Sequence, residues 1–133
     1  MRVALDTNIY ISAILFGGLP ELPIRLARSR KITLLVSEPI IAELTGVLRT
    51  KFNWDQDRIR DVEKELRVIA KVVKTKTVIS AVSDEPDNRI LECAVDGRAH
   101  LIVSGDSHLI ALESYAGTRI ISPRQFAERF GLT

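Results

Sequence analysis

The chain opens with Arg2-Val3-Ala4-Leu5-Asp6-Thr7-Asn8, a short apolar run that ends in an aspartate and a Thr-Asn pair. The apolar residues have the character of a strand buried in a sheet. A carboxylate at the end of such a strand must be solvated, paired or bound to a cation, because an isolated ionised group is costly to bury. The stretch therefore predicts a buried first strand that delivers Asp6 to a polar site.

Three further acids stand at the edges of apolar segments. Asp106 follows the run Leu101-Ile102-Val103, which has the composition of another buried strand. Glu43 and Asp87 lie on segments whose apolar residues recur at helical spacing, and each acid borders the apolar stripe. Singly, each acid fits an ordinary role such as a turn residue, an N-cap or a helix-edge charge. Those roles do not explain why two strands end in aspartate while two helix acids border apolar faces.

Apolar runs and helical stripes alternate along the chain. The short apolar runs predict strands, which we expect at residues 2–5, 33–36, 77–79, 101–103 and 119–121. Helices are expected at residues 8–16, 22–29, 38–48, 55–74, 86–97 and 123–130, and in a short stretch that ends at Leu112. Thr7 or Asn8 is the expected N-cap of the first helix and Ser37 that of the third, while Pro86 fits the first turn and Gly97 the end of the fifth. Continuous apolar strands that alternate with helices are typical of a parallel sheet covered on both faces. We therefore expect an α/β fold: one domain over residues 1–133, with a central parallel sheet of about five strands flanked by helices on both faces.

Composition narrows the class of protein. A length of 133 residues and an apolar fraction of 46% suit a single packed core. No apolar run approaches the ~20 residues that a membrane span needs, and the chain enters its first strand without a signal-peptide segment, so we expect a cytoplasmic protein without a membrane partner. The single cysteine, Cys93, excludes an internal disulfide. The net charge of +2 is too balanced to predict nucleic-acid binding by itself.

The four acids suggest a metal site. In an open parallel sheet, ligands bind beyond the carboxyl ends of the strands, where Asp6 and Asp106 are expected and where Glu43 and Asp87 can converge. Carboxylates crowded together raise one another's pKa unless a cation joins them. An oxygen-only ligand set suits Mg²⁺ or Mn²⁺ better than Zn²⁺. One or two such ions would serve phosphoryl chemistry.

Four motifs taken together resemble the PIN-domain ribonucleases. They are Leu5-Asp6-Thr7-Asn8 after the first strand, Glu43 on the helix after the second, Asp87-Asn88 opening a helix, and Ser104-Gly105-Asp106 after a strand. The resemblance covers almost the whole chain in order, and it is closest to the single-domain proteins described as toxin components of toxin–antitoxin pairs. It implies a parallel sheet flanked by helices and an endoribonuclease that depends on Mg²⁺ or Mn²⁺.

The resemblance also implies roles for particular residues. The positions that match the family's metal-binding and catalytic acids are Asp6, Glu43, Asp87 and Asp106. Asn8, Ser104 and Asn88 are expected beside them as polar side chains that support the acids or position substrate. Because RNA brings negative charge to the acids, basic side chains are also needed: Arg89, two residues after Asp87, is the first candidate to hold the RNA backbone, and the group from Arg25 to Lys31 is the second. In this branch a further acid often follows two residues after the Gly-Asp aspartate, where this chain has His108. Because a neutral imidazole lacks the charge of a carboxylate, both one and two ions stay open.

The resemblance implies partners as well, and two other functions compete with it. Single-stranded RNA is the implied substrate, with a small antitoxin protein and a homodimer as implied assemblies. The first alternative is a catalytically inactive module of the same fold that binds RNA or protein. The second is a Mg²⁺-dependent phosphatase with an aspartate nucleophile, although such enzymes normally carry a second aspartate where this chain has Asn8.

Overall fold

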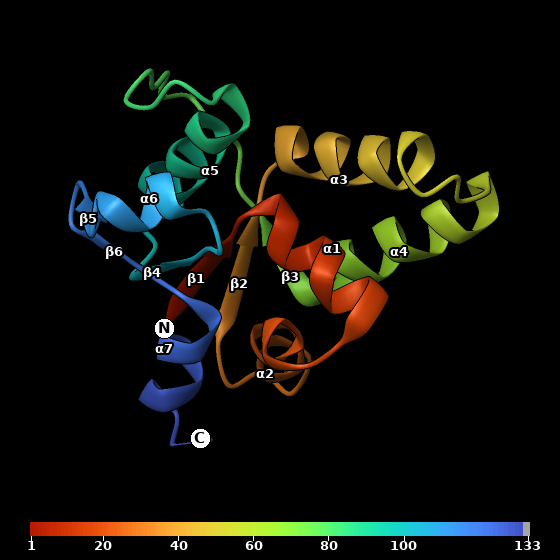
Figure 1. Ribbon diagram of the computed structural model, residues 1–133, viewed down its shortest axis with the longest axis horizontal. Helices are drawn as coiled ribbons and strands as arrows, with labels where there is room; N and C mark the ends of the chain where they lie inside the picture. Colours follow the sequence, from red (N-terminus) through yellow and green to blue (C-terminus); the bar gives the residue numbers. More distant parts are fainter. Residues whose placement is uncertain (132–133) are drawn as a thin grey trace.

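A computed structural model of the protein describes residues 1–131, which form one six-stranded sheet with helices on both sides (Figure 1). The strand order is β3-β2-β1-β4-β6-β5. The strands are β1 Arg2–Leu5, β2 Thr33–Val36, β3 Ala70–Val72, β4 Leu101–Val103, β5 Ser114–Tyr115 and β6 Thr118–Ile121. Neighbours pair in parallel except for the antiparallel hairpin of β5 and β6. The expected α/β class is confirmed, with a mostly parallel sheet that has one short antiparallel strand at its edge.

Helices lie on both faces of the sheet. They are α1 Thr7–Phe16, α2 Leu22–Arg28 after a 3-10 turn at Leu19–Glu21, α3 Glu38–Thr50, α4 Gln56–Ile69, α5 Glu85–Asp96, α6 Ser107–Ala111 and α7 Pro123–Arg129. Figure 1 shows α5 and α6 on one side of the strands, and α1, α2 and α4 on the other.

In residues 1–131 no single helix is long and apolar enough to cross a membrane. The pair formed by α1 and the segment Leu19–Arg28 is long and apolar enough by length and composition, but it is bent by 116° at the break between them.

Burial of both faces explains the continuous apolar strands. Val3, Ala4 and Leu5 are fully buried, and so are the last three residues of β2. Each strand between two helical layers must present apolar side chains on both faces, so its sequence shows no alternation of polar and apolar residues. This is why the sequence alone places β1 and β2 at their observed bounds.

The third strand differs from its prediction. It is β3 at Ala70–Val72, whereas the expected strand at residues 77–79 has no regular structure and the expected helix 55–74 ends at Ile69. Ala70 pairs with Leu34 of β2, and the Val73 amide donates to the Val36 carbonyl at 2.7 Å. The burial of Val73 thus comes from pairing at the sheet edge, not from the helical stripe, because tertiary pairing overrides local periodicity.

The strand order reverses between β1 and β4. Strands β2 and β3 are added on one side of β1, and β4 and β6 on the other. Leu5 pairs with Val103, so the residues that follow the two strands leave the sheet side by side. In doubly wound sheets the ligand crevice lies at this switch point, beyond the carboxyl ends of the strands.

Gly97, which follows α5, tests how tightly this helix packs on the sheet, and Gly46 in α3 serves as a control. A Cβ at Gly97 would lie 2.8 Å from Leu35 Cδ1 and 2.9 Å from Val73 Cγ2, whereas a Cβ at Gly46 in α3 would meet nothing within 4 Å. We expect Gly97→Ala to lower the free energy of unfolding by about 1–3 kcal/mol through overpacking. Gly46→Ala should raise it by about 0.5–1 kcal/mol, because alanine favours the helix. Urea unfolding measures both changes, and a neutral Gly97→Ala would contradict this packing.

Candidate functional site

Ser104 joins the two aspartates that follow the central strands. Its side chain is fully buried, and its hydroxyl donates a hydrogen bond to Asp6 Oδ2. The same Ser104 oxygen accepts a hydrogen bond from the Asp106 amide at 2.9 Å. The Asp6 amide itself donates to the Val103 carbonyl at 3.1 Å. These bonds fix the exits of β1 and β4 relative to one another and hold the Asp6 carboxylate at the edge of the sheet.

Both aspartates also cap the helix that follows. Asp6 Oδ1 accepts from the Ile9 amide at 2.9 Å, and Asp106 Oδ1 accepts from the His108 amide at 2.7 Å. The expected cap of α1 at Thr7 or Asn8 is wrong, because the carboxylate directly after the strand already reaches the first-turn amides. A helix N-terminus also favours negative charge there. Each cap therefore orients a carboxylate toward the switch point.

Asp87 brings a third carboxylate from the first turn of α5. It is only 6% exposed, and its Oδ2 is buried without a hydrogen-bond partner among residues 1–131. Carboxylate oxygens of Asp84, Asp87 and Asp106 all lie within 4.8 Å of one another. Burial, together with the charges of Asp106, Asp84 and Asp6, raises the pKa of Asp87 to about 7. A cation bound among these carboxylates would therefore stabilise the ionised form of Asp87.

Glu43 approaches the same place from α3, where it is half-buried. Burial raises the pKa of Glu43, and the nearby charges of Asp84 and Asp6 add to that rise. Burial likewise raises the pKa of Asp6, although Ser104 and backbone amides oppose it. The structure thus joins Asp6 and Asp106 through Ser104 and places Asp106 close to Asp87, while Glu43 of α3 is near enough to Asp84 and Asp6 for their charges to raise its pKa.

Asp84 is the acid that sequence reasoning missed. It occupies the N-cap position of α5 and is exposed, yet its carboxylate belongs to the cluster with Asp87 and Asp106. The signal was its position three residues before Asp87, since residues three apart at a helix start lie on the same side.

The polar residues expected beside the acids are placed differently from one another. Ser104 lies between two of the acids, while Asn8 is exposed on the first turn of α1. Asn88 is fully buried, and its amide group bonds the Val82 backbone. Arg89 pairs with Glu85 and Glu92, so its guanidinium is occupied by neighbours on α5. His108 is exposed, with Nδ1 3.5 Å from Asp106 Oδ1.

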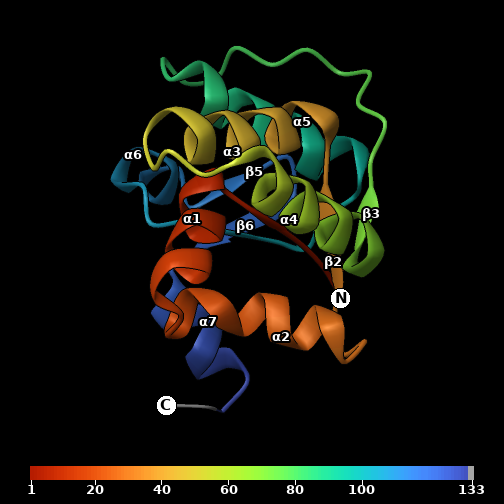
Figure 2. The ribbon, with the colours of Figure 1, turned by 90° about the vertical axis from the view of Figure 1, so that its right-hand side faces the viewer.

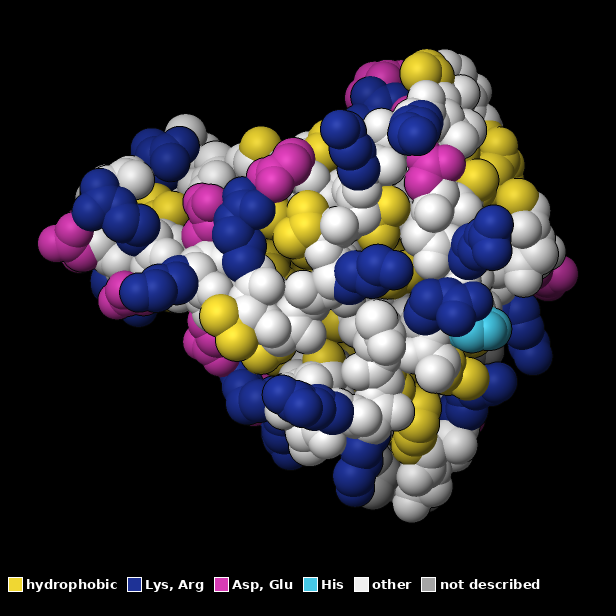
Figure 3. All heavy atoms as spheres, turned by 180° about the vertical axis from the view of Figure 1, so that it is seen from behind, with side chains coloured by type: hydrophobic (Ala, Val, Ile, Leu, Met, Phe, Trp, Pro, Cys, Tyr) yellow, Lys and Arg dark blue, Asp and Glu magenta, His cyan; other side chains and the backbone are white. Residues whose placement is uncertain are grey.

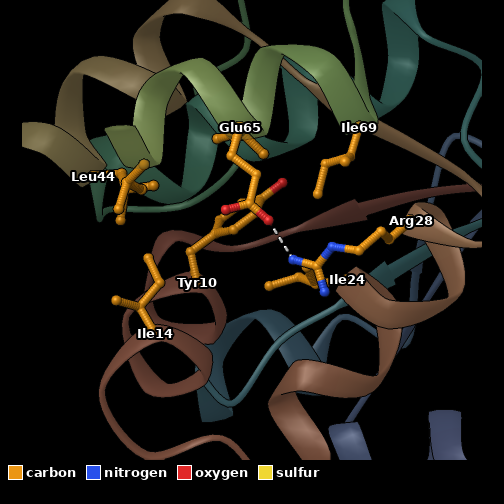
Figure 4. A pocket seen from close by; sticks show the side chains of 9 residues that line it. Tyr10, Ile14, Ile24, Arg28, Leu44, Glu65 and Ile69 are labelled. Carbon is orange, nitrogen blue, oxygen red and sulfur yellow. Dashed lines mark hydrogen bonds and ion pairs between the residues drawn. The ribbon is translucent and has the colours of Figure 1, made fainter. Parts of the chain in front are cut away.

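An apolar cavity lies elsewhere, among α1, α2, α3 and α4 (Figure 4). Its walls include Ile14 and Leu44, and an ion pair between Arg28 and Glu65 stands at its edge. The Tyr10 hydroxyl reaches it without a hydrogen-bond partner in the described part of the chain, and burial raises the pKa of that hydroxyl. Because none of the clustered acids lines it, the cavity is separate from the candidate site.

The site and the fold together define a class of protein: a doubly wound α/β domain with carboxylates gathered at the switch point of its sheet. Comparison with protein families identifies it further. The model of the PIN domain matches residues 2–108, and the chain belongs to the PIN domain family.

Two relatives share most of their length with the chain. The Uncharacterized protein MJ1680 of Methanocaldococcus jannaschii is 26% identical over 144 residues, covering 98% of this chain and 92% of the relative. The second is a chain in the crystal structure of VapBC2 from Rickettsia felis bound to a DNA fragment from their promoter. It has a TM-score of 0.64 and 17% sequence identity, covering 92% of this chain and 98% of that chain. At this identity the second likeness shows the fold alone.

The raised pKa of Asp87 predicts how the metal-free protein responds to pH. Between about pH 4 and pH 7 the folded protein keeps a proton on Asp87 that the unfolded chain has released, so stability falls as the pH rises through this window. We expect Asp87→Asn to raise the melting temperature in chelator at pH 8, by roughly 3–5 °C for each kcal/mol of repulsion removed. Calorimetry at pH 5 and pH 8 tests this, and an unchanged pH dependence in the variant would sink it.

Proposed function

We propose that the protein is an endoribonuclease that uses Mg²⁺ or Mn²⁺ to hydrolyse phosphodiester bonds in single-stranded RNA. The observation that carries the proposal is the buried, unpartnered Oδ2 of Asp87, within a cluster of carboxylate oxygens at the switch point of the sheet. A buried carboxylate without a partner calls for a cation. The donors are all oxygens, which hard divalent ions prefer.

In this proposal, Asp6, Glu43, Asp87 and Asp106 hold one or two ions. Both oxygens of Asp6 already accept hydrogen bonds, but each carboxylate oxygen can accept more than one contact. Ser104 and the helix caps keep Asp6 and Asp106 from turning away when no cation is present. When bound, the ion supplies an activated water and stabilises the leaving oxygen of the phosphodiester.

The charge of RNA sets a further requirement. An RNA strand adds negative charge to a cluster of carboxylates, so a cation at the cluster and basic side chains around it must offset that charge. Figure 3 shows Lys and Arg side chains spread widely over the face opposite to that of Figure 1. Arg89 does not serve this purpose in the proposal, because Glu85 and Glu92 occupy its guanidinium.

The geometry does not favour the phosphatase alternative. An aspartate nucleophile needs a carboxylate oxygen free to attack phosphorus. Asp6 is 2% exposed, with one oxygen bonded to the Ile9 amide and the other to the Ser104 hydroxyl. A bound ion can share an oxygen that already accepts a hydrogen bond, so the same contacts leave Asp6 able to serve as a metal ligand in this proposal.

The activity itself is the first test. We expect wild-type protein with Mn²⁺ to cleave unstructured RNA in a pool of structured and unstructured transcripts, and excess chelator to abolish cleavage. Asp6→Asn/Asp106→Asn should lower the rate at least about 100-fold, since even residues that only support a metal ligand often cost 10–100-fold. The variant should also lose Mn²⁺ affinity in calorimetric titration while keeping its circular dichroism spectrum.

Two outcomes would contradict this function. Cleavage that survives both chelator and the double substitution would come from another site or a contaminant. If the wild type neither binds Mn²⁺ nor cleaves RNA, the result would support the inactive RNA- or protein-binding module instead.

We also propose that the chain is the toxin of a toxin–antitoxin pair: a small antitoxin covers the acidic site, and the chain forms a homodimer. The support is the likeness to toxin components of such pairs and the fold shared with a chain of VapBC2 from Rickettsia felis. If a small neighbouring reading frame encodes this partner, co-expression should yield a complex by gel filtration with at least about tenfold lower RNA cleavage. A neighbour that changes neither elution nor activity would remove this assignment and leave the nuclease proposal standing.

A further inference from the structure

The connection between β3 and α5 is a long segment without regular secondary structure, residues 73–84, which we call the strap. Figure 2 shows it running around the outside of the molecule from the end of β3 to the start of α5. Irregular segments leave backbone amides without partners in a ladder, and those amides need other acceptors. The last residue of the strap is Asp84, the additional acid of the candidate site.

Three side chains of α5 supply acceptors for the strap. They are Asn88, Glu92 and Asp96, and their spacing of four residues puts them on one face of the helix. The contacts are from the Lys76 and Thr77 amides to Asp96 Oδ2 at 2.6 and 2.9 Å, from the Ile79 amide to Glu92 Oε2 at 2.9 Å, and from the Val82 amide to Asn88 Oδ1 at 3.1 Å. We call this series of contacts the ladder. It fastens the strap to α5 at three successive points that lead toward Asp84.

The ladder includes groups that are costly to bury. Glu92 is 6% exposed and Asn88 is fully buried. Arg89 pairs with Glu92 at 2.8 Å and also donates to the Ile79 carbonyl at 3.3 Å, so it joins both sides of the middle contact. A buried carboxylate is tolerated only when it is paired and hydrogen-bonded. This face of α5 is therefore built around a docked strap, since an undocked strap would leave both side chains without their backbone partners.

The side chain of Asp84 is not used as a helix cap. Within residues 1–131, Asp6, Asp55 and Asp106 each accept a hydrogen bond from a first-turn amide of their helix, and Asp84 alone among these aspartate N-caps makes no such bond. Its backbone carbonyl accepts from the Asp87 amide at 3.1 Å instead. The carboxylate is thus free to remain near Asp87 and Asp106, although an exposed acid beside two others is repelled toward solvent.

We propose that Asp84 is a further ligand of the divalent ion and that the ladder of Asn88, Glu92 and Asp96 is a positioning device that holds it at the site. This inference rests on the proposed metal-dependent function. It is supported independently by Asp87, whose buried and unpartnered oxygen belongs to the same cluster. The ladder offsets the repulsion among the acids by fixing the backbone that carries Asp84, so the site is assembled before the ion arrives.

Metal titration of three variants tests the ligand role and the positioning role separately. Asp84→Asn should weaken Mn²⁺ binding about tenfold in calorimetry, a change typical of the loss of one supporting or peripheral group. Asp96→Ala removes the acceptor of the Lys76 and Thr77 amides and should also weaken binding. In the Asp84→Asn background, Asp96→Ala should cause no further loss, because the ladder acts through Asp84.

Asp61→Ala is the matched control. Asp61 is an exposed acid on α4 whose side chain makes no hydrogen bond or ion pair with the described residues, so its removal changes the net charge by the same amount without touching the strap. It should leave Mn²⁺ affinity unchanged. In metal-free protein, Asp96→Ala should also speed hydrogen exchange at Lys76 and Thr77, a measurement that does not depend on the ion.

The outcomes separate this inference from the proposed function. If the wild type binds Mn²⁺ and Asp84→Asn binds it equally well, Asp84 is not a ligand and the inference fails while the nuclease proposal stands. If Asp96→Ala lowers Mn²⁺ affinity equally in the wild type and in the Asp84→Asn variant, the ladder does not act through Asp84. A wild type that binds no Mn²⁺ would remove the proposed function, and the ligand role of Asp84 with it.

Discussion

The parallel pairing of β1 with β4 is the constraint on which the rest of the site depends. Because Leu5 lies opposite Val103, the chain leaves both strands at the same level. The Ser104 hydroxyl can therefore donate to the Asp6 carboxylate and accept from the Asp106 amide. The same pairing fixes where α1 and α6 begin, since each helix is capped by one of these aspartates. Loss of this register would move the two carboxylates apart and uncap two helices at once.

A second constraint is the negative charge of the acids that gather beyond the ends of β1 and β4. Asp87 from α5 and Glu43 from α3 complete a group of acids in which burial and mutual repulsion both raise the pKa. The metal-free fold must supply other interactions to hold such a group together. Hydrogen bonds from Ser104 and from helix amides do so for the strand-end acids. Preorganisation of this kind is what a site for a small, strongly charged ligand requires, because the acids need not be gathered when the ligand binds.

Helix α5 connects the sheet, the site and the strap. It packs on β1 and β2, so closely that a Cβ at Gly97 would lie 2.8 Å from Leu35 Cδ1 of β2. Its first turn carries Asp87 to the switch point, and its polar face receives the strap through Asn88, Glu92 and Asp96. One helix therefore sets the position of two acids, Asp87 directly and Asp84 through the strap. A polar helix face that resembles an ordinary solvated surface in the sequence is here largely occupied by a neighbouring segment of the same chain.

The sequence by itself determined the buried strands and the acids at their ends, because apolar runs and strand-end aspartates are local patterns. It predicted the bounds of β1 and β2 and the convergence of Asp6 and Asp106 at one edge. Only the tertiary structure decided that the edge strand is Ala70–Val72, that Asn88 and Arg89 hold the strap, and that Asp84 joins the cluster. The physical reason is that local periodicity shows which side chains are buried, whereas the partner of a backbone amide or a carboxylate is chosen among residues far away in the chain.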